Sequence, residues 1–179
     1  DCTRHGRTFD SGAALLNYNE AAKHSMAAIK YKNKREYLDF YGAAMVNRFQ
    51  KVVRHWQADV LIPVPIHPSR RRKRGFNQAE ELAKRLSLGW GIPVEKRFLI
   101  RSKRTAPQRD LDPTERLKNL EKAFCIYPGY ERNRKAPRCV ILVDDIYTTG
   151  STMEACSRVL KAAGVEKIYF VVICIGHGR

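Results

Sequence analysis

Short apolar runs alternate with helically spaced apolar positions along this chain, and the alternation predicts a succession of strands and helices. The runs lie at residues 60–66, 94–100, 123–127, 139–144 and 168–175. Continuous apolar character without a polar alternation is typical of strands buried on both faces, as in a parallel sheet. The pattern therefore predicts an α/β fold, with a doubly wound parallel sheet flanked by helices.

Helical spacing is clearest between these runs. Apolar residues recur at i, i+3, i+4 and i+7 from Ala79 to Leu86, and Asn77 precedes them as the expected N-cap. A second helix is predicted from Ser151 to Ala163. Before the first of the runs, the pattern predicts a short strand at 14–18 and helices at 19–31 and 36–56.

The segment from Val140 to Thr152 joins an apolar run to a polar turn. Asp144 and Asp145 follow the run directly, at the end of the predicted strand where open α/β sheets bind ligands. Carboxylates accept hydrogen bonds from vicinal sugar hydroxyls and hold metal ions directly or through water.

The turn that follows contains four hydroxyl side chains around one glycine: Thr148, Thr149, Gly150, Ser151 and Thr152. Backbone N–H groups, hydroxyls and the start of a helix can together hold a phosphate. An alternative is that Asp145 opens a turn and the hydroxyls only cap the helix. A cap needs one such residue, so the pattern favours a sugar-phosphate site.

These thirteen residues resemble the signature of the type I phosphoribosyltransferases, which bind 5-phosphoribosyl-1-pyrophosphate (PRPP). The resemblance implies that Asp144 and Asp145 are the catalytic, ribose-binding residues. It also implies Mg²⁺ at these aspartates, held through water or PRPP, and a 5'-phosphate wrapped by Thr148 to Thr152. Tyr147 departs from the signature, which usually has a smaller aliphatic residue there.

A second segment, from Ile62 to Ala79, includes the run Arg-Gly-Phe-Asn-Gln at residues 74–78. It resembles the ComF family of competence-associated, phosphoribosyltransferase-like proteins, which includes GntX-like members. The resemblance implies that the strand ending near Ile66 leads into a loop facing pyrophosphate, where His67 and Arg70 are candidate ligands.

The ComF resemblance also implies a division of the chain. Residues 1–11 would be the remnant of an N-terminal zinc-ribbon region, 12–57 a small helical hood over the active site, and 58–179 the phosphoribosyltransferase core. Cys2 and His5 offer no second pair of ligands at close spacing, so no zinc site is expected.

A third segment, residues 102–124, is polar and contains two prolines. It resembles the mobile flap that closes over PRPP in type I phosphoribosyltransferases, which makes Arg104, Gln108 and Arg109 candidates for contacting pyrophosphate or the acceptor. The alternative is that Gln108 is a surface residue and that the segment simply starts a helix near Asp112.

Five consecutive cations follow the first core run: Arg70, Arg71, Arg72, Lys73 and Arg74. They point in several directions, so they cannot all bind one pyrophosphate. The formal net charge is +16, from 34 Lys and Arg against 18 Asp and Glu, and it favours polyanions. Single-stranded DNA is therefore a candidate partner of this run. The alternative is a solvated basic loop.

The remaining features concern location. Five cysteines, an odd number, are spread widely along the chain, a pattern typical of reduced thiols in a cytoplasmic protein. The longest apolar run, 168–175, is too short to span a bilayer, so no membrane insertion is expected.

Three functions remain open. The first is a PRPP-binding, Mg²⁺-dependent phosphoribosyltransferase-like protein acting in natural competence, with single-stranded DNA and a competence helicase as partners implied by the resemblance. The second is a catalytically inactive PRPP-sensing or DNA-binding module. The third is a nucleobase salvage phosphoribosyltransferase. The sequence contains no obvious general base and does not define the acceptor, so turnover is undecided at this point.

Overall fold

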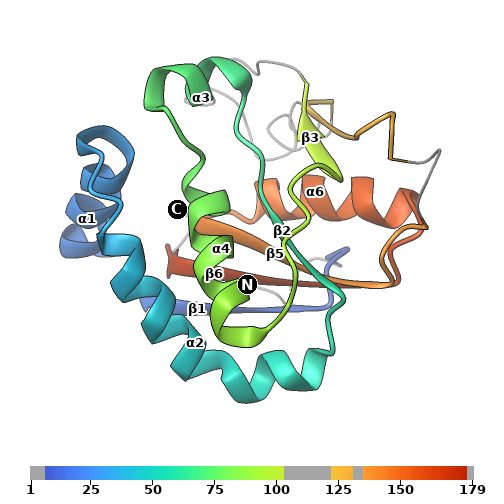
Figure 1. Ribbon diagram of the computed structural model, residues 1–179, viewed down its shortest axis with the longest axis horizontal. Helices are drawn as coiled ribbons and strands as arrows, with labels where there is room; N and C mark the ends of the chain where they lie inside the picture. The colour runs from blue at the N-terminus through green and yellow to red at the C-terminus, as the bar shows by residue number, and fades with distance from the viewer. Residues whose placement is uncertain (1–6, 103–121, 131–134, 177–179) are drawn as a thin grey trace.

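The computed structural model describes residues 7–102, 122–130 and 135–176. Strands and helices alternate along these residues (Figure 1). The elements are β1 (Ser11–Asn17), α1 (Glu20–Lys32), α2 (Tyr37–Trp56), β2 (Val60–Pro63), α3 (Pro68–Arg74), α4 (Gln78–Trp90), β3 (Leu99–Arg101), β4 (Phe124–Ile126), β5 (Cys139–Tyr147), α6 (Ser151–Ala162) and β6 (Lys167–Ile175). The predicted flap residues Arg104, Gln108 and Arg109 lie outside the described residues, as do Cys2 and His5.

A four-stranded sheet forms the centre of the fold, in the order β1-β6-β5-β2. Every neighbouring pair in it is parallel. Helices connect β1 to β2, β2 to β5 and β5 to β6, as parallel pairing requires. The predicted α/β fold with a parallel sheet flanked by helices is therefore confirmed.

Two of the predicted core strands are not members of this sheet. The predictions at 94–100 and 123–127 were wrong in this respect, because β3 and β4 pair with each other, antiparallel, in a separate two-stranded sheet. The start of the first run touches the main sheet through an isolated parallel bridge from Val94 to Leu61, where the Glu95 N–H donates to the Leu61 carbonyl oxygen at 2.9 Å. The fourth strand of the main sheet is instead β1, which pairs along β6 from Ser11 to Asn17. The division of the chain at residues 12 and 58 stays a prediction.

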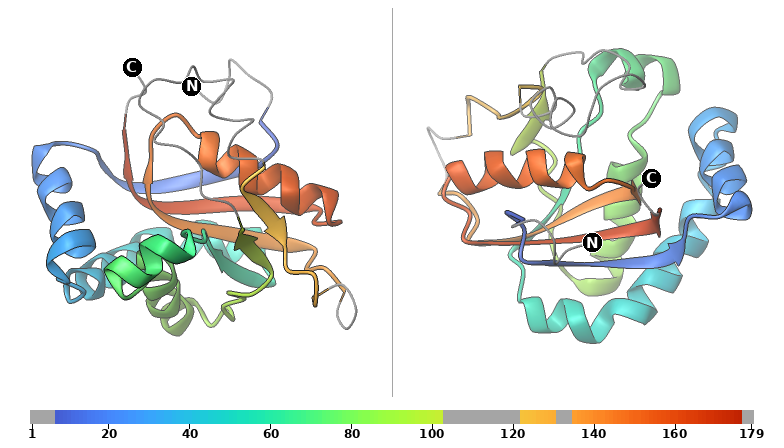
Figure 2. Two further views of the ribbon diagram at one scale, coloured as in Figure 1. Left: turned by 90° about the horizontal axis from the view of Figure 1, so that it is seen from above. Right: turned by 180° about the vertical axis from the view of Figure 1, so that it is seen from behind.

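Helices cover both faces of the sheet, and side chains alternate between the faces along each strand. One face packs against α1, α2 and α4, with Ile141 and Val143 pointing toward them. The other face packs against α6 and the β3–β4 pair, with Val140 and Leu142 pointing that way. Figure 2 shows α6 and α2 on opposite sides of the strands. The two helices predicted before the first core run and the helix predicted after the Thr/Ser turn are confirmed to within one residue at each end.

The connections diverge at β5. The connection from β2 to β5 places α4 on one face, whereas the connection from β5 to β6 places α6 on the other. In addition, β2 pairs with β5 only as far as Pro63 and Val143, and β5 continues to Tyr147. A crevice between diverging connections, at the carboxyl ends of parallel strands, is the usual ligand position in such sheets.

No helix among the described residues has both the length and the apolar character needed to cross a membrane.

Candidate functional site

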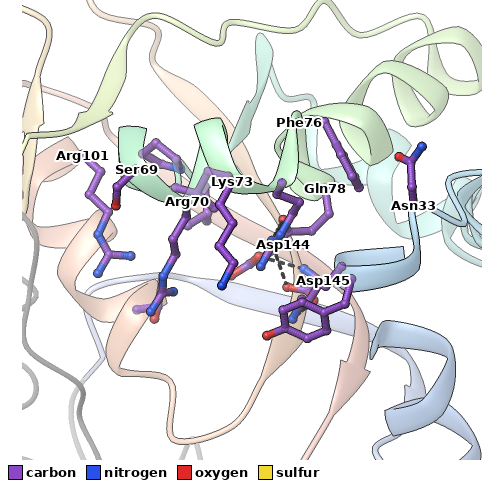
Figure 3. A pocket seen from close by; sticks show the side chains of 16 residues that line it. Asn33, Ser69, Arg70, Lys73, Phe76, Gln78, Arg101, Asp144 and Asp145 are labelled. Carbon is purple, nitrogen blue, oxygen red and sulfur yellow. Dashed lines mark hydrogen bonds and ion pairs between the residues drawn. The ribbon is translucent and has the colours of Figure 1, made fainter. Parts of the chain in front are cut away.

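A cavity of about 920 Å³ lies at this crevice. Side chains from six elements line it: Lys30 and Tyr31 from α1, Arg70, Lys73 and Arg74 from α3, Gln78 from α4, Arg101 from β3, Asp144 and Asp145 from β5, and Thr152 from α6. Figure 3 shows Arg70 and Lys73 extending from α3, near Arg101, into the space beside the aspartates. Two acids and a group of cations therefore share one cavity.

The two aspartates differ in their surroundings. Successive residues of a strand point to opposite faces, so Asp145 lies on the face of α1 and α4, and Asp144 on the face of α6. Asp145 pairs with Lys30, and its Oδ1 accepts a hydrogen bond of 3.4 Å from Gln78 Nε2. Asp144 Oδ1 accepts a hydrogen bond of 2.8 Å from the backbone N–H of Asp145.

These surroundings shift the pKa values of the two carboxyl groups in opposite directions. Burial raises the pKa of Asp144 well above its usual value, and the neighbouring charge of Asp145 raises it further. Burial also raises the pKa of Asp145, but the Lys30 ammonium and the hydrogen bonds outweigh it, so this pKa is lowered overall. Asp145 is thus the carboxylate that stays ionised. The ionised form of Asp144 is the one that an added cation or hydroxyl donor would stabilise most.

The predicted phosphate loop leads from β5 into α6. Gly150 has a φ of 77°, in the left-handed region that favours glycine. The Thr149 and Ser151 hydroxyls lie 2.9 Å apart in a hydrogen bond, Thr148 is exposed, and Thr152 lines the cavity. The N-cap of α6 is Gly150, which has no side chain to cap the helix. The Ser151 N–H donates to the Thr149 hydroxyl over a long 3.4 Å, and the start of a helix suits an anion.

Tyr147, the departure from the signature, packs under this loop and away from the cavity. Its ring is buried and stacks on Phe170, with ring centroids 5.0 Å apart. The ring also lies against Gly150, where any Cβ would meet Tyr147 Cζ at 2.8 Å. Tyr147 therefore acts as a support for the loop and reinforces the need for glycine at position 150.

The chain before β1 holds the same loop from behind. An N–H of Arg7 donates to the carbonyl oxygen of Thr149 at 3.2 Å. Thr8 donates from its backbone N–H and its hydroxyl to the buried carboxylate of Glu154, at 2.9 and 2.6 Å. Glu154 lies in the first turn of α6, so residues 7 and 8 fix both the loop and the helix that it starts.

The basic run predicted as a loop is a short helix, α3, and its cations lie on different faces of the helix. Arg70, Lys73 and Arg74 lie at i, i+3 and i+4 and line the cavity. Arg71 points elsewhere and pairs with the buried Glu80 carboxylate at 3.1 Å, and Arg72 is exposed and absent from the cavity lining. One helix therefore presents cations both to the cavity and to its outside.

His67 is placed at the beginning of this helix. Its Nδ1 accepts a hydrogen bond of 3.1 Å from the backbone N–H of Ser69 and lies 2.8 Å from the Ser69 hydroxyl. These contacts make His67 the N-cap of α3, and it is not among the residues that line the cavity. Its candidate role at pyrophosphate stays a prediction.

Several cavity residues were missed from the sequence. Lys30 and Tyr31 lie in the last turn of α1, but nothing in their own sequence pattern indicated that this end of the helix reaches the aspartates. Arg101 ends β3 and lies over the Phe124 ring at 5.2 Å. Burial lowers its pKa, a sign of a cation held inside the protein. Its only sequence signal was a cation at the end of a strand.

The acids of the site supply too few ligands to hold a divalent cation by themselves. Within residues 7–102, 122–130 and 135–176, no cluster of three or more His, Cys, Asp or Glu side chains is arranged to bind a metal. Asp144 and Asp145 lie on opposite faces of β5, so each could supply one ligand, directly or through water. The remaining ligands would have to come from a bound molecule.

Comparison with known proteins decides the family. The model of the phosphoribosyl transferase domain matches residues 49–179. The chain belongs to this family.

Its relatives confirm the predicted place within the ComF family. Competence protein F of Haemophilus influenzae (strain Rd) is 40% identical over 110 residues, which are 62% of this chain and 47% of that protein. Competence protein ComFC of Bacillus subtilis (strain 168) is 29% identical over 164 residues, 88% of this chain and 62% of that protein. The DNA utilization protein YhgH of Escherichia coli O157:H7 is 30% identical over 116 residues, 65% and 49% of the two chains. The phosphoribosyltransferase-like chain thus spans 47% to 62% of the length of these relatives.

Proposed function

We propose that the cavity binds PRPP together with Mg²⁺, and that the protein is a phosphoribosyltransferase-like member of the DNA-uptake machinery. One observation carries the binding proposal: the two aspartates, the start of α6 and three cations of α3 line the same cavity. A sugar phosphate with a pyrophosphate group needs all three side by side: acceptors for its hydroxyls, a helix start for its phosphate and cations for its pyrophosphate. Membership of the phosphoribosyl transferase domain family supports the same ligand.

The arrangement assigns parts of PRPP to parts of the cavity. Asp144 and Asp145 would accept hydrogen bonds from the ribose hydroxyls, and the loop from Thr148 to Thr152 would hold the 5'-phosphate. Arg70, Lys73 and Arg101 would face the pyrophosphate. Mg²⁺ would be held by Asp144 or Asp145, directly or through water, and would supply positive charge that stabilises the pyrophosphate.

The chemistry that such a complex supports is displacement at the anomeric carbon of the ribose. The bond from that carbon to the pyrophosphate oxygen breaks, and a bond to the acceptor nucleophile forms. The cations of α3 would stabilise the charge that develops on the departing pyrophosphate. The aspartates and the phosphate loop would hold the ribose in a fixed orientation toward the acceptor.

Isothermal titration of the protein with PRPP, with and without Mg²⁺, tests the binding proposal. We expect saturable one-to-one binding that weakens at least about tenfold without Mg²⁺, because a divalent ion would offset the repulsion between the phosphate charges and the aspartates. Ribose 5-phosphate and pyrophosphate, titrated separately, should each bind more weakly than PRPP. A titration with PRPP that does not saturate, or an equal affinity for PRPP and pyrophosphate, would contradict the proposal.

A role in natural competence and the handling of single-stranded DNA is the second part of the proposal. The relatives named Competence protein F, ComFC and DNA utilization protein YhgH support it, as does the formal charge of +16. Of the two cations of α3 that face away from the cavity, Arg72 is exposed, and Arg71 is 57% exposed although it pairs with Glu80, so both can contact a DNA backbone. A competence helicase is the protein partner that the ComF family suggests.

The two faces of α3 allow a matched experiment, because two pairs of substitutions remove the same charge. Arg70→Gln with Lys73→Gln should lower PRPP affinity at least about tenfold, since each removes a charge-assisted interaction with pyrophosphate. Arg71→Gln with Arg72→Gln should leave PRPP affinity unchanged. The same pair should weaken single-stranded DNA binding and reduce its salt slope by about 0.7 for each phosphate that the protein no longer neutralises.

Titration of all three proteins with PRPP and with a labelled oligonucleotide over a range of salt concentrations provides the measurement. Equal weakening of both ligands in both variants would mean that only net charge matters and that the faces of α3 have no separate roles. An unaltered salt slope for the outward pair would place the DNA-binding cations on another part of the surface.

A further inference from the structure

The N-terminal helix α1 contributes a cation directly to the site. The Lys30 ammonium, in the last turn of α1, pairs with Asp145 Oδ2. The side chain of Lys30 is 19% exposed and that of Asp145 8%, so the pair is largely removed from water. It is therefore less screened than the surface pairs of this protein, such as Lys23 with Glu20.

This pair is part of a closed series of interactions around the cavity. Gln78 of α4 donates to Asp145 Oδ1, and Arg74 of α3 donates to Gln78 Oε1. The Arg74 guanidinium in turn lies over the Tyr31 ring, 5.8 Å from its centroid, which returns the series to α1. Four elements are thus joined through one carboxylate.

Both oxygens of Asp145 are therefore engaged by the protein itself. Oδ2 pairs with Lys30 and Oδ1 accepts from Gln78. A ribose hydroxyl or a divalent cation that approaches Asp145 meets a carboxylate already neutralised by an ammonium. The two cations cannot share the Oδ2 position, because like charges in a space with little water repel each other strongly.

We propose that Lys30 is an internal counter-cation of the site, which PRPP with its divalent ion must displace from Asp145, so that ligand binding releases the last turn of α1. The inference rests on the proposed PRPP binding and adds a regulation of that same site. Lys30 holds the charge of Asp145 while the cavity is empty and competes with the ligand that replaces it. The flexible four-carbon stem of lysine allows this exchange without unfolding α1.

The release has a structural route. Asn33, which ends α1, has a left-handed backbone with a φ of 54°. The segment from Lys32 to Lys34 is exposed. The last turn of α1 is thus followed by a short exposed connection to α2, and Lys30 can withdraw from Asp145 by a local change. Ligand binding would in this way alter the basic segment that begins at Lys30.

Lysine acylation followed by mass spectrometry tests the proposal on the whole chain. Lys30 should react slowly in the free protein and several times faster with saturating PRPP and Mg²⁺, whereas the exposed Lys32 and Lys34 should react equally fast in both states. Protection of Lys30 that persists or deepens in the complex would overturn the proposal. It would mean that Lys30 remains on Asp145 or contacts the ligand.

Affinity measurements on variants give an independent readout. Lys30→Met should raise PRPP affinity in the presence of Mg²⁺ about fivefold, the effect of removing one competing, partly buried ion pair. Lys32→Met is the matched control on the same helix and should have no effect. Lys30→Arg keeps the charge and should not show the gain. A loss of affinity in Lys30→Met, with thermal unfolding unchanged, would make Lys30 a ligand-binding residue and overturn the competition.

A failure of the Lys30 proposal can be distinguished from a failure of the proposed PRPP binding. If the wild-type protein does not bind PRPP, the proposed function fails first. Acylation of Lys30 in the Asp145→Asn variant then still reports whether the pair exists, because loss of the carboxylate should speed the reaction at Lys30 alone. Normal reactivity in wild type and variant alike would reject the counter-cation directly.

Discussion

Replacing Asp144 and Asp145 together by alanine is expected to abolish PRPP binding and to leave the protein folded. Both carboxylates are within the part of β5 that extends beyond β2, at the edge of the core. Under the proposed function, the pair would offer the hydrogen-bond acceptors for the ribose hydroxyls and the acids for a divalent ion. Each lost hydrogen bond to a charged group weakens binding by about 1.5–3 kcal/mol, so the loss should be at least about 100-fold.

Single amide variants separate the two roles. Asp145→Asn removes the charge that Lys30 neutralises, and Asp144→Asn removes the carboxyl whose pKa is raised by burial and by Asp145. Both should bind PRPP weakly, but only Asp145→Asn should also free Lys30. Asp39→Asn, an exposed acid on α2, is the control. Titration calorimetry with thermal unfolding of each variant makes the measurement. Unchanged affinity in the double alanine variant, with normal unfolding, would end the sugar-phosphate interpretation.

The parts of this site that could be predicted are those that a single segment encodes. Val140 to Val143 form a continuous apolar run, and Asp144 and Asp145 follow it without interruption. Local composition alone therefore predicts a buried strand followed by acids, although β5 continues past them to Tyr147. The opposite orientations of the two aspartates also follow, because side chains alternate along any strand.

What the sequence could not predict was which distant segments pair with each other. A strand was predicted at residues 14–18, where the structure has β1 at Ser11–Asn17, but its partner β6 lies at the other end of the chain. The runs at 94–100 and 123–127 looked like core strands, since an apolar run does not specify its neighbour. In the structure β3 and β4 pair with each other antiparallel, which needs no crossover helix.

The same limit explains the cavity residues that were missed. Lys30 belongs to a helix whose own sequence gives no sign of a contact with the aspartates. Only the packing of α1 on the same face of the sheet as Asp145 brings the two side chains together. The cations of α3 were recognised as too many for one ligand. Their division into two faces required the knowledge that Arg70 to Arg74 are helical, a property that a run of five cations does not reveal.

Gly150→Ala is expected to destabilise the protein and to weaken PRPP binding together. The left-handed φ of 77° disfavours any residue with a Cβ by about 1–2 kcal/mol. The new methyl would also collide with the Tyr147 ring, whose Cζ lies 2.8 Å from the Cβ position. The ring cannot move away easily, because it is buried and stacked on Phe170. Overpacking of this kind adds about 1–3 kcal/mol, so the free energy of unfolding should fall by about 2–5 kcal/mol.

The Tyr147→Leu background separates the two causes of this loss. Leucine resembles the smaller aliphatic residue usual in the family signature, and it removes the atoms that the new methyl would meet. Gly150→Ala should therefore lose only the backbone contribution there, about 1–2 kcal/mol. Urea unfolding of the four proteins measures the coupling, and titration with PRPP follows the loop. Equal losses in both backgrounds would show that Tyr147 does not support the loop. A stable Gly150→Ala protein with normal PRPP affinity would show that the loop from Thr148 to Thr152 does not hold the phosphate in this backbone conformation.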